Sequence, residues 1–162
     1  MEPHVGVIVR ALAAALCAWA LYAWVWVPHR DSLELTELAR RTDGASKTAG
    51  DYERMVRARR NVADLSRLRE SAPNDVRVPM LIAANQLLMG LREEAVRSYD
   101  DALRVDPRPE IYIARGDALV QLGRVDEAVE SYATAVRYDA RFLDFVAAGI
   151  LQDQIKARAE SL

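Results

Sequence analysis

A chain of 162 residues with a net charge of −2 has room for one domain and an appendage, and offers no overall positive charge to nucleic acid. Its single cysteine, Cys17, excludes an intramolecular disulfide framework, and its two histidines, His4 and His29, flank opposite ends of an apolar segment. Because no phosphate loop, zinc pattern or nucleophile–base pair can be assembled from the rest, we expect no cofactor, metal site, small-molecule substrate or catalytic residue.

That apolar segment, residues 5–27, is interrupted by one charge, Arg10, which lies near its start and could extend to the headgroups. As a helix of 1.5 Å rise per residue it would reach about 34 Å, enough for a hydrocarbon core of about 30 Å. Aromatic residues gather towards its far end as in an interfacial belt: Trp19, Tyr22, Trp24 and Trp26. We therefore expect residues 1–30 to form an N-terminal tail and a single transmembrane anchor.

Two further questions about this segment are whether it is processed and which way it is oriented in the membrane. A cleaved signal peptide could use Ala18-Trp19-Ala20, but bulky apolar residues continue beyond it, and Leu16 before Cys17 fits a lipoprotein site poorly. Arg30, Arg40 and Arg41 outnumber Arg10, which favours a cytoplasmic domain, whereas a short tail before an apolar core is typical of a signal-anchor that sends the rest outward. We favour a domain on the periplasmic side of a bacterial inner membrane.

The connector, residues 31–50, is expected to hold a short helix and a linker. Asp31 with Glu34 suggests a capped helix that ends near Arg41, and the small polar run 42–50 suggests a loop. Residues 51–75 are then expected to contain a capping helix that has Asp51 as its N-terminal cap and stops before Pro73. Its apolar stripe would consist of Tyr52, Met55, Val56, Val62, Ala63, Leu65 and Leu68.

This helix is also rich in arginine. A basic contact face for anionic headgroups or an acidic partner would be formed by Arg54, Arg57, Arg60 and Arg67. The alternative is a solvated face with intrahelical ion pairs, such as Arg60 with Asp64.

Residues 76–142 contain an internal repeat. The segment Met89–Tyr99 returns as Leu122–Tyr132, and each pair of equivalent positions is 33 residues apart. In each copy a glycine, Gly90 or Gly123, follows an apolar run and suits the left-handed position that ends a first helix, and acidic residues then begin a second helix. A fixed period of this length is typical of a solenoid of helical hairpins.

At these residues the chain resembles the tetratricopeptide repeat family. The second copy, 109–142, has family signature residues at Tyr112, Gly116, Leu119, Gly123, Ala128, Tyr132 and Ala135, but departs at Arg115 and Ala140. The first copy, 76–108, matches at Ile82, Ala83, Gly90, Ala95, Tyr99, Ala102 and Pro107, with Pro79 replacing the usual aromatic. The resemblance implies an all-α, right-handed superhelical stack, closed by a C-terminal capping helix in residues 143–162 whose pattern begins near Phe142.

The resemblance also implies where partners bind, because first helices line the concave face of such a solenoid. The candidates are Arg77, Met80, Ala84, Leu87, Leu88, Glu110, Ile113, Asp117, Val120 and Gln121. Met80, Leu87 and Leu88 could instead be buried against the N-terminal helix or against residues 31–41. Met80 and Ala84 stand where a carboxylate clamp would need polar residues, so we do not expect that activity.

Together these patterns predict a non-catalytic, membrane-tethered scaffold that holds a protein partner at a membrane complex. The alternatives are a structural subunit whose transmembrane helix is the main interface, or an assembly chaperone.

Overall fold

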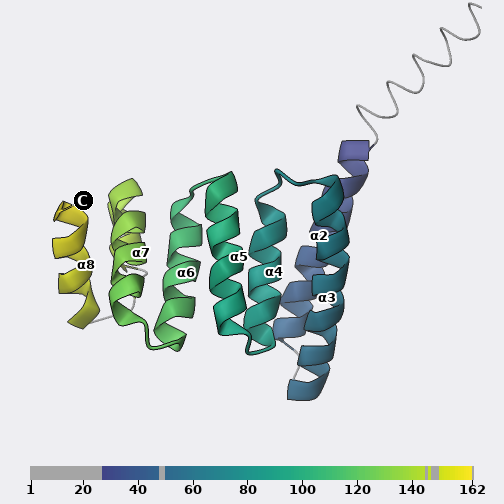
Figure 1. Ribbon diagram of the computed structural model, residues 1–162, viewed down its shortest axis with the longest axis horizontal. Helices are drawn as coiled ribbons and strands as arrows, with labels where there is room; N and C mark the ends of the chain where they lie inside the picture. The colour runs from purple at the N-terminus through teal and green to yellow at the C-terminus, as the bar shows by residue number, and fades with distance from the viewer. Residues whose placement is uncertain (1–26, 48–49, 145, 147–149, 162) are drawn as a thin grey trace, which may run out of the picture. The chain divides into compact units, whose positions relative to one another are not determined.

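The computed structural model describes residues 27–47, 50–144, 146 and 150–161 (Figure 1). Their regular structure is entirely helical, which confirms the all-α class over these ranges. The elements are α2 (Val27–Ser46), α3 (Asp51–Ser71), α4 (Arg77–Leu88), α5 (Arg92–Val105), α6 (Pro109–Gln121), α7 (Val125–Tyr138), the 3-10 helix η2 (Ala140–Asp144) and α8 (Ile150–Ser161).

The predicted anchor, residues 5–27, lies outside the described residues except for its last position. Among the helices that are described, none combines the length and the apolar composition needed to cross a bilayer.

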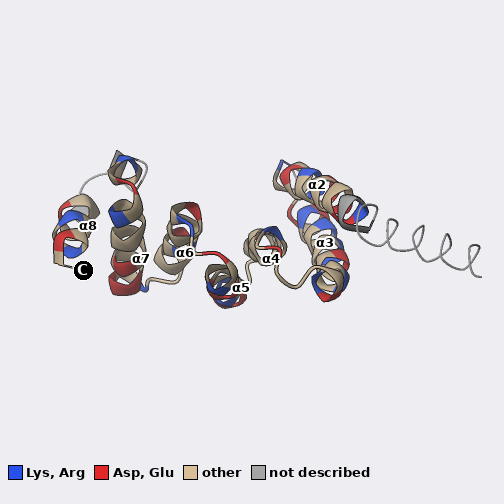
Figure 2. Ribbon diagram, turned by 90° about the horizontal axis from the view of Figure 1, so that it is seen from above, with Lys and Arg blue, Asp and Glu red and all other residues tan. Residues whose placement is uncertain are grey.

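The chain divides into two compact units, Met1–Glu37 and Leu38–Leu162. Within the second, each helix from α3 to α8 packs against the next along the chain. Seen from above, α4 and α6 lie on one side of this row and α5 on the other (Figure 2). This alternation is expected of stacked helical hairpins, in which each pair buries its apolar face against its neighbours.

The turns inside the two repeats are built alike. Gly90 and Gly123 have φ of 76° and 73°, the left-handed conformation expected from their positions. The N–H of Leu91 donates to the carbonyl of Gln86 at 2.9 Å, and the N–H of Gly90 to that of Leu87 at 2.9 Å. The same two bonds recur one period later, where the N–H of Arg124 donates to the carbonyl of Leu119 and the N–H of Gly123 donates to that of Val120. These are Schellman caps, which bond the last carbonyls of α4 and α6.

The ends of α3, α5 and α7 also match one another. The N–H groups of Ala72, Asp106 and Asp139 donate to the carbonyls of Leu68, Ala102 and Ala135 at 2.9, 3.0 and 3.1 Å. In addition, Asn61, Leu65 and Leu68 precede Ala95, Tyr99 and Ala102 by the same interval of 34 residues, and all six are buried. The helix α3 therefore occupies the place of a second helix in a preceding, diverged hairpin.

The N-terminal part differs from the prediction in three ways. Asp31 lies inside α2, not at its start, and α2 continues through the expected loop to Ser46. Asp51 is the first residue of α3, with Gly50 as its cap. In the expected stripe of α3, Tyr52, Val56 and Ala63 are exposed, while the buried residues are Ala58, Asn61, Leu65 and Leu68. Periodicity was misleading here because two of the buried positions are polar or small.

A buried polar network explains why α2 stays helical past Arg41. Asn85 of α4 donates to the hydroxyl of Thr42 at 2.8 Å, and the amide of Asn61 donates to Asn85 at 3.1 Å. The Thr42 hydroxyl in turn donates to the carbonyl of Leu38 at 2.9 Å. Asn85 is 0% exposed, and polar groups so deeply buried must be bonded within the protein. The tertiary contact thus overrides the loop-like composition of residues 42–46.

The C-terminal end begins with the short helix η2, so Phe142, where the pattern of the capping helix was expected to begin, lies in a 3-10 helix, and α8 spans Ile150–Ser161. Phe145 and Gly149, part of that pattern, lie outside the described residues. Ile155 of α8 is fully buried, and Arg158 pairs with Glu130 of α7 at 2.8 Å. The helix α8 therefore covers the apolar side of α7.

Candidate partner-binding site

The ten residues predicted for the concave face all lie on the first helices of the two repeats, five on α4 and five on α6. The two helices share one side of the row (Figure 2). What each side chain contacts decides whether it can meet a partner.

Three of the apolar candidates contribute to the core. Met80, Leu87 and Ile113 are partly buried and pack against the main apolar cluster of the repeats. Ala84 and Leu88 are also half-buried. By contrast, Val120 is 38% exposed, which leaves it as the apolar candidate most open to a partner.

Most of the polar candidates have partners within the chain. Arg77 forms an ion pair with Asp75 at 2.6 Å, and Gln121 accepts a hydrogen bond from Arg92 at 3.2 Å. Glu110 is exposed and has no hydrogen bond or ion pair among the described residues. Glu110 and Val120 are thus the two candidates on α6 that are exposed and uncommitted.

Asp117 is exposed, but its carboxylate accepts a hydrogen bond from the hydroxyl of Tyr132 at 2.6 Å. Burial, together with this bond to Asp117, raises the pKa of the Tyr132 phenol. Asp117 therefore anchors α7 to α6 as well as facing solvent.

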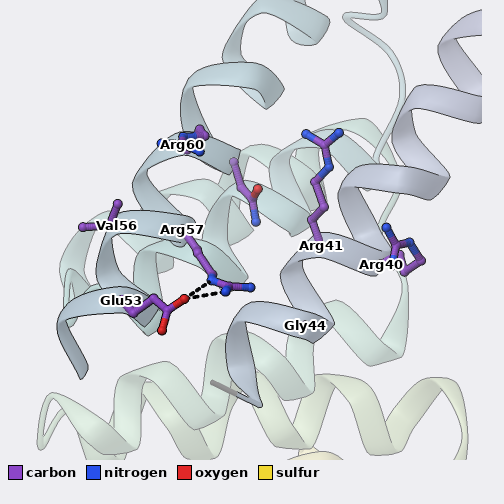
Figure 3. Close-up of a pocket in the computed structure, with 8 residues that line it drawn as sticks. Arg40, Arg41, Gly44, Glu53, Val56, Arg57 and Arg60 are labelled. Carbon is purple, nitrogen blue, oxygen red and sulfur yellow. Dashed lines mark hydrogen bonds and ion pairs between the residues drawn. The ribbon is translucent and has the colours of Figure 1, made fainter. Parts of the chain in front are cut away.

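The arginines predicted as a basic contact face separate into two groups. Arg54 pairs with Asp51, and Arg67 pairs with Asp64, so these two are partly neutralised along α3. Arg57, which pairs with Glu53, and Arg60 line a cavity of about 550 Å³ between α3 and the end of α2 (Figure 3). The expected pair of Arg60 with Asp64 is not formed, because Asp64 bonds to Arg67 and lies 3.6 Å from Arg41.

Residues that the sequence did not single out complete this cavity. Arg40, Arg41 and Gly44 of α2 and Glu53, Val56 and Asn61 of α3 provide the rest of its lining. In Figure 3, Arg41 extends between the two helices. The adjacent pair Arg40-Arg41 was visible in the sequence, but the loop expected after it hid the approach of α2 to α3. The grouping of four arginines around one cavity therefore could not be predicted from the sequence and is seen only in the folded chain.

Arg115, the departure from the family pattern, has a structural explanation. Its guanidinium donates to the carboxylate of Asp100 on α5 at 2.7 Å and to the hydroxyl of Ser131 on α7 at 2.6 Å. One side chain on α6 thus ties together three helices.

Comparison with known proteins identifies a tetratricopeptide repeat at residues 109–142, which contain α6 and α7. No curated protein matches the chain. Tetratricopeptide repeats are protein–protein interaction modules, and this one lies next to a hairpin, α4–α5, with the same turn and the same helix ends. Within the described residues, no three His, Cys, Asp or Glu side chains are grouped to hold a metal ion.

Proposed function

We propose that this chain is a non-catalytic adaptor that binds a protein partner through the exposed side of α4 and α6. The observation that carries the proposal is the tetratricopeptide repeat at residues 109–142. Val120 and Glu110 on α6 supply an exposed apolar and an exposed acidic contact, which suits an amphipathic helix or an extended segment.

The second part of the proposal is a membrane tether formed by residues 5–27. It is supported by the apolar run of the sequence, by its aromatic far end and by Arg10 near its start. A tether raises the effective concentration of the adaptor for partners in the same membrane without any new contact. We place the repeats on the periplasmic side of a bacterial inner membrane, which protease digestion of right-side-out vesicles tests directly.

The test of partner binding uses the full-length chain in its membrane. Val120→Glu places a charge on the proposed contact, whereas Val125→Glu changes an equally exposed valine, at 41% against 38%, at the start of α7. We expect Val120→Glu to abolish chemical crosslinking to the partner and Val125→Glu to leave it intact. Equal effects of the two changes would contradict the proposal.

A second variant tests the role of the tether. Residues 5–27 are exchanged for an unrelated apolar helix of the same length. An adaptor keeps its partner after the exchange, because the contact lies in the repeats. Loss of assembly with the helical domain still folded would instead identify the transmembrane helix as the main interface.

A further inference from the structure

We infer that the arginine-lined cavity between α2 and α3 is a second docking site, which takes acidic side chains from a protein partner. The inference rests on the proposed function only in that the partner is a protein. The cavity lies on the diverged hairpin that precedes the two repeats, and all of its lining residues belong to one compact unit.

The charge of the cavity lining is positive on balance, with Arg57 paired to Glu53 and Arg41 lying 3.6 Å from Asp64. Its eight lining residues include four arginines, Arg40, Arg41, Arg57 and Arg60, and one carboxylate, that of Glu53 (Figure 3). Its volume of about 550 Å³ lies within the range of about 300–1,000 Å³ in which proteins hold ligands. Like charges gathered around one hollow raise its positive potential and favour an anionic occupant.

The chemistry of that occupant is indicated by Glu53. Its carboxylate accepts hydrogen bonds from both Nε, at 3.1 Å, and a terminal nitrogen of Arg57. Both bonds go to the same oxygen, Oε1, so one guanidinium of this lining already binds a carboxylate. Arg60 follows Glu53 by seven residues on α3 and forms no ion pair with any described residue. It lies about 10 Å along the helix from Glu53, so a second carboxylate could bind there without direct repulsion.

The surroundings favour a peptide over a membrane surface or a phosphate ion. Val56, in the lining, is 37% exposed, and Tyr52, one turn earlier on α3, is 76% exposed. A bilayer surface would meet the recess only through single lipid headgroups, and a phosphate ion would gain nothing from these two side chains. An acidic segment can place carboxylates in the recess and lay an apolar residue against Val56 and Tyr52.

The experiment measures binding of fluorescein-labelled hexaglutamate to the full-length, detergent-solubilised chain by fluorescence anisotropy. The double variant Arg40→Gln with Arg60→Gln removes two charges from the cavity. Its matched control is Arg97→Gln with Arg137→Gln, two exposed arginines on α5 and α7 with the same change of net charge. Circular dichroism confirms that each variant is folded.

We expect the cavity variant to bind the probe about tenfold more weakly than the wild type, and the control variant to bind it nearly unchanged. Glu53→Gln should strengthen binding, because it removes the carboxylate that occupies Arg57. Added salt should weaken binding, as it does for exposed charges.

Equal losses in the cavity and control variants would overturn the inference, as would arginine-dependent binding of inorganic phosphate or of phosphatidylglycerol vesicles without binding of the peptide. This outcome is separable from failure of the proposed function. The proposed function fails if Val120→Glu leaves partner capture intact, whatever the peptide does.

Discussion

Gly116 is required by a contact between α6 and α7. A Cβ atom at this position would lie 2.5 Å from Cε1 and 2.8 Å from Cδ1 of the Tyr132 ring. Tyr132 is 1% exposed and its hydroxyl is bonded to Asp117, so the ring cannot move away without losing both packing and a hydrogen bond. The signature pair of glycine and tyrosine is thus a steric fit.

We predict that Gly116→Ala lowers the free energy of unfolding by about 1–3 kcal/mol, the usual cost of overpacking a core. Gly44→Ala in α2 is the matched control, because nothing lies within 4 Å of its added Cβ atom. Alanine there should be neutral or stabilising by up to about 1 kcal/mol through helix propensity. Urea denaturation measures both, and a Gly116→Ala variant as stable as wild type would contradict the contact.

Tyr99 should make the free energy of unfolding decrease as the pH becomes alkaline. Burial raises the pKa of its phenol to about 12, with the charge of Asp117 adding to the effect. The folded state therefore keeps a proton that the unfolded state releases near pH 10, and stability falls as the pH rises from 10 to 12.

The predicted loss is about 2 kcal/mol across that window. Tyr99→Phe should make the fall smaller, because it removes the phenol and keeps the ring. Denaturation midpoints measured at pH 9, 10, 11 and 12 compare the two proteins. Parallel curves would show that Tyr99 does not contribute.

At the scale of elements, Arg115 is the clearest link between helices. It bonds to Asp100 of α5 and to Ser131 of α7, and Ser131 is 2% exposed. Arg115→Met should cost about 1–3 kcal/mol, because it leaves a buried hydroxyl without that partner. Arg115→Lys should not restore the loss fully, since one ammonium group lacks the two-sided reach of a guanidinium.

Arg124→Met is the control for this prediction, because Arg124 forms an ion pair with Glu127 on the exposed start of α7. It should change stability little, as exposed pairs usually do. Thermal unfolding of the three variants tests the prediction. Equal stability of Arg115→Met and Arg124→Met would contradict the bridging role.

The elements also show where sequence reasoning succeeds and where it fails. The repeat turns were predictable because Gly90 and Gly123 carry a local signal that backbone geometry demands. The length of α2 was not, because Thr42 is held by Asn85, which lies 43 residues away. The bridging role of Arg115 was not predictable either, because its partners belong to the neighbouring helices.

The same limit applies to the candidate sites. The predicted concave-face residues do fall on α4 and α6, since helical spacing fixes a face. Which of them are exposed depends on packing, so Met80 and Ile113 could not be separated from Val120 beforehand. Likewise Arg57 and Arg60 were recognised as basic, but their cavity also depends on Arg40, Arg41 and Gly44 at the end of α2.

At the scale of the whole molecule, the chain combines a helical-repeat surface with an arginine-lined cavity on the preceding hairpin (Figures 1 and 3). We propose that both contact one protein partner, and that residues 5–27 hold the complex at a membrane. Two separate contacts on one partner would bind more tightly than either alone, provided both can be engaged together.

The most direct test of this account is site-specific photo-crosslinking of the full-length chain in intact membranes. A photoreactive residue is placed at Val120, on the proposed contact side of α6, or at Val125, on α7, as the equally exposed control. We predict one discrete crosslinked protein from position 120 and none from position 125. No protein product at position 120, or the same products at both positions, would contradict the claim that the repeats bind a partner.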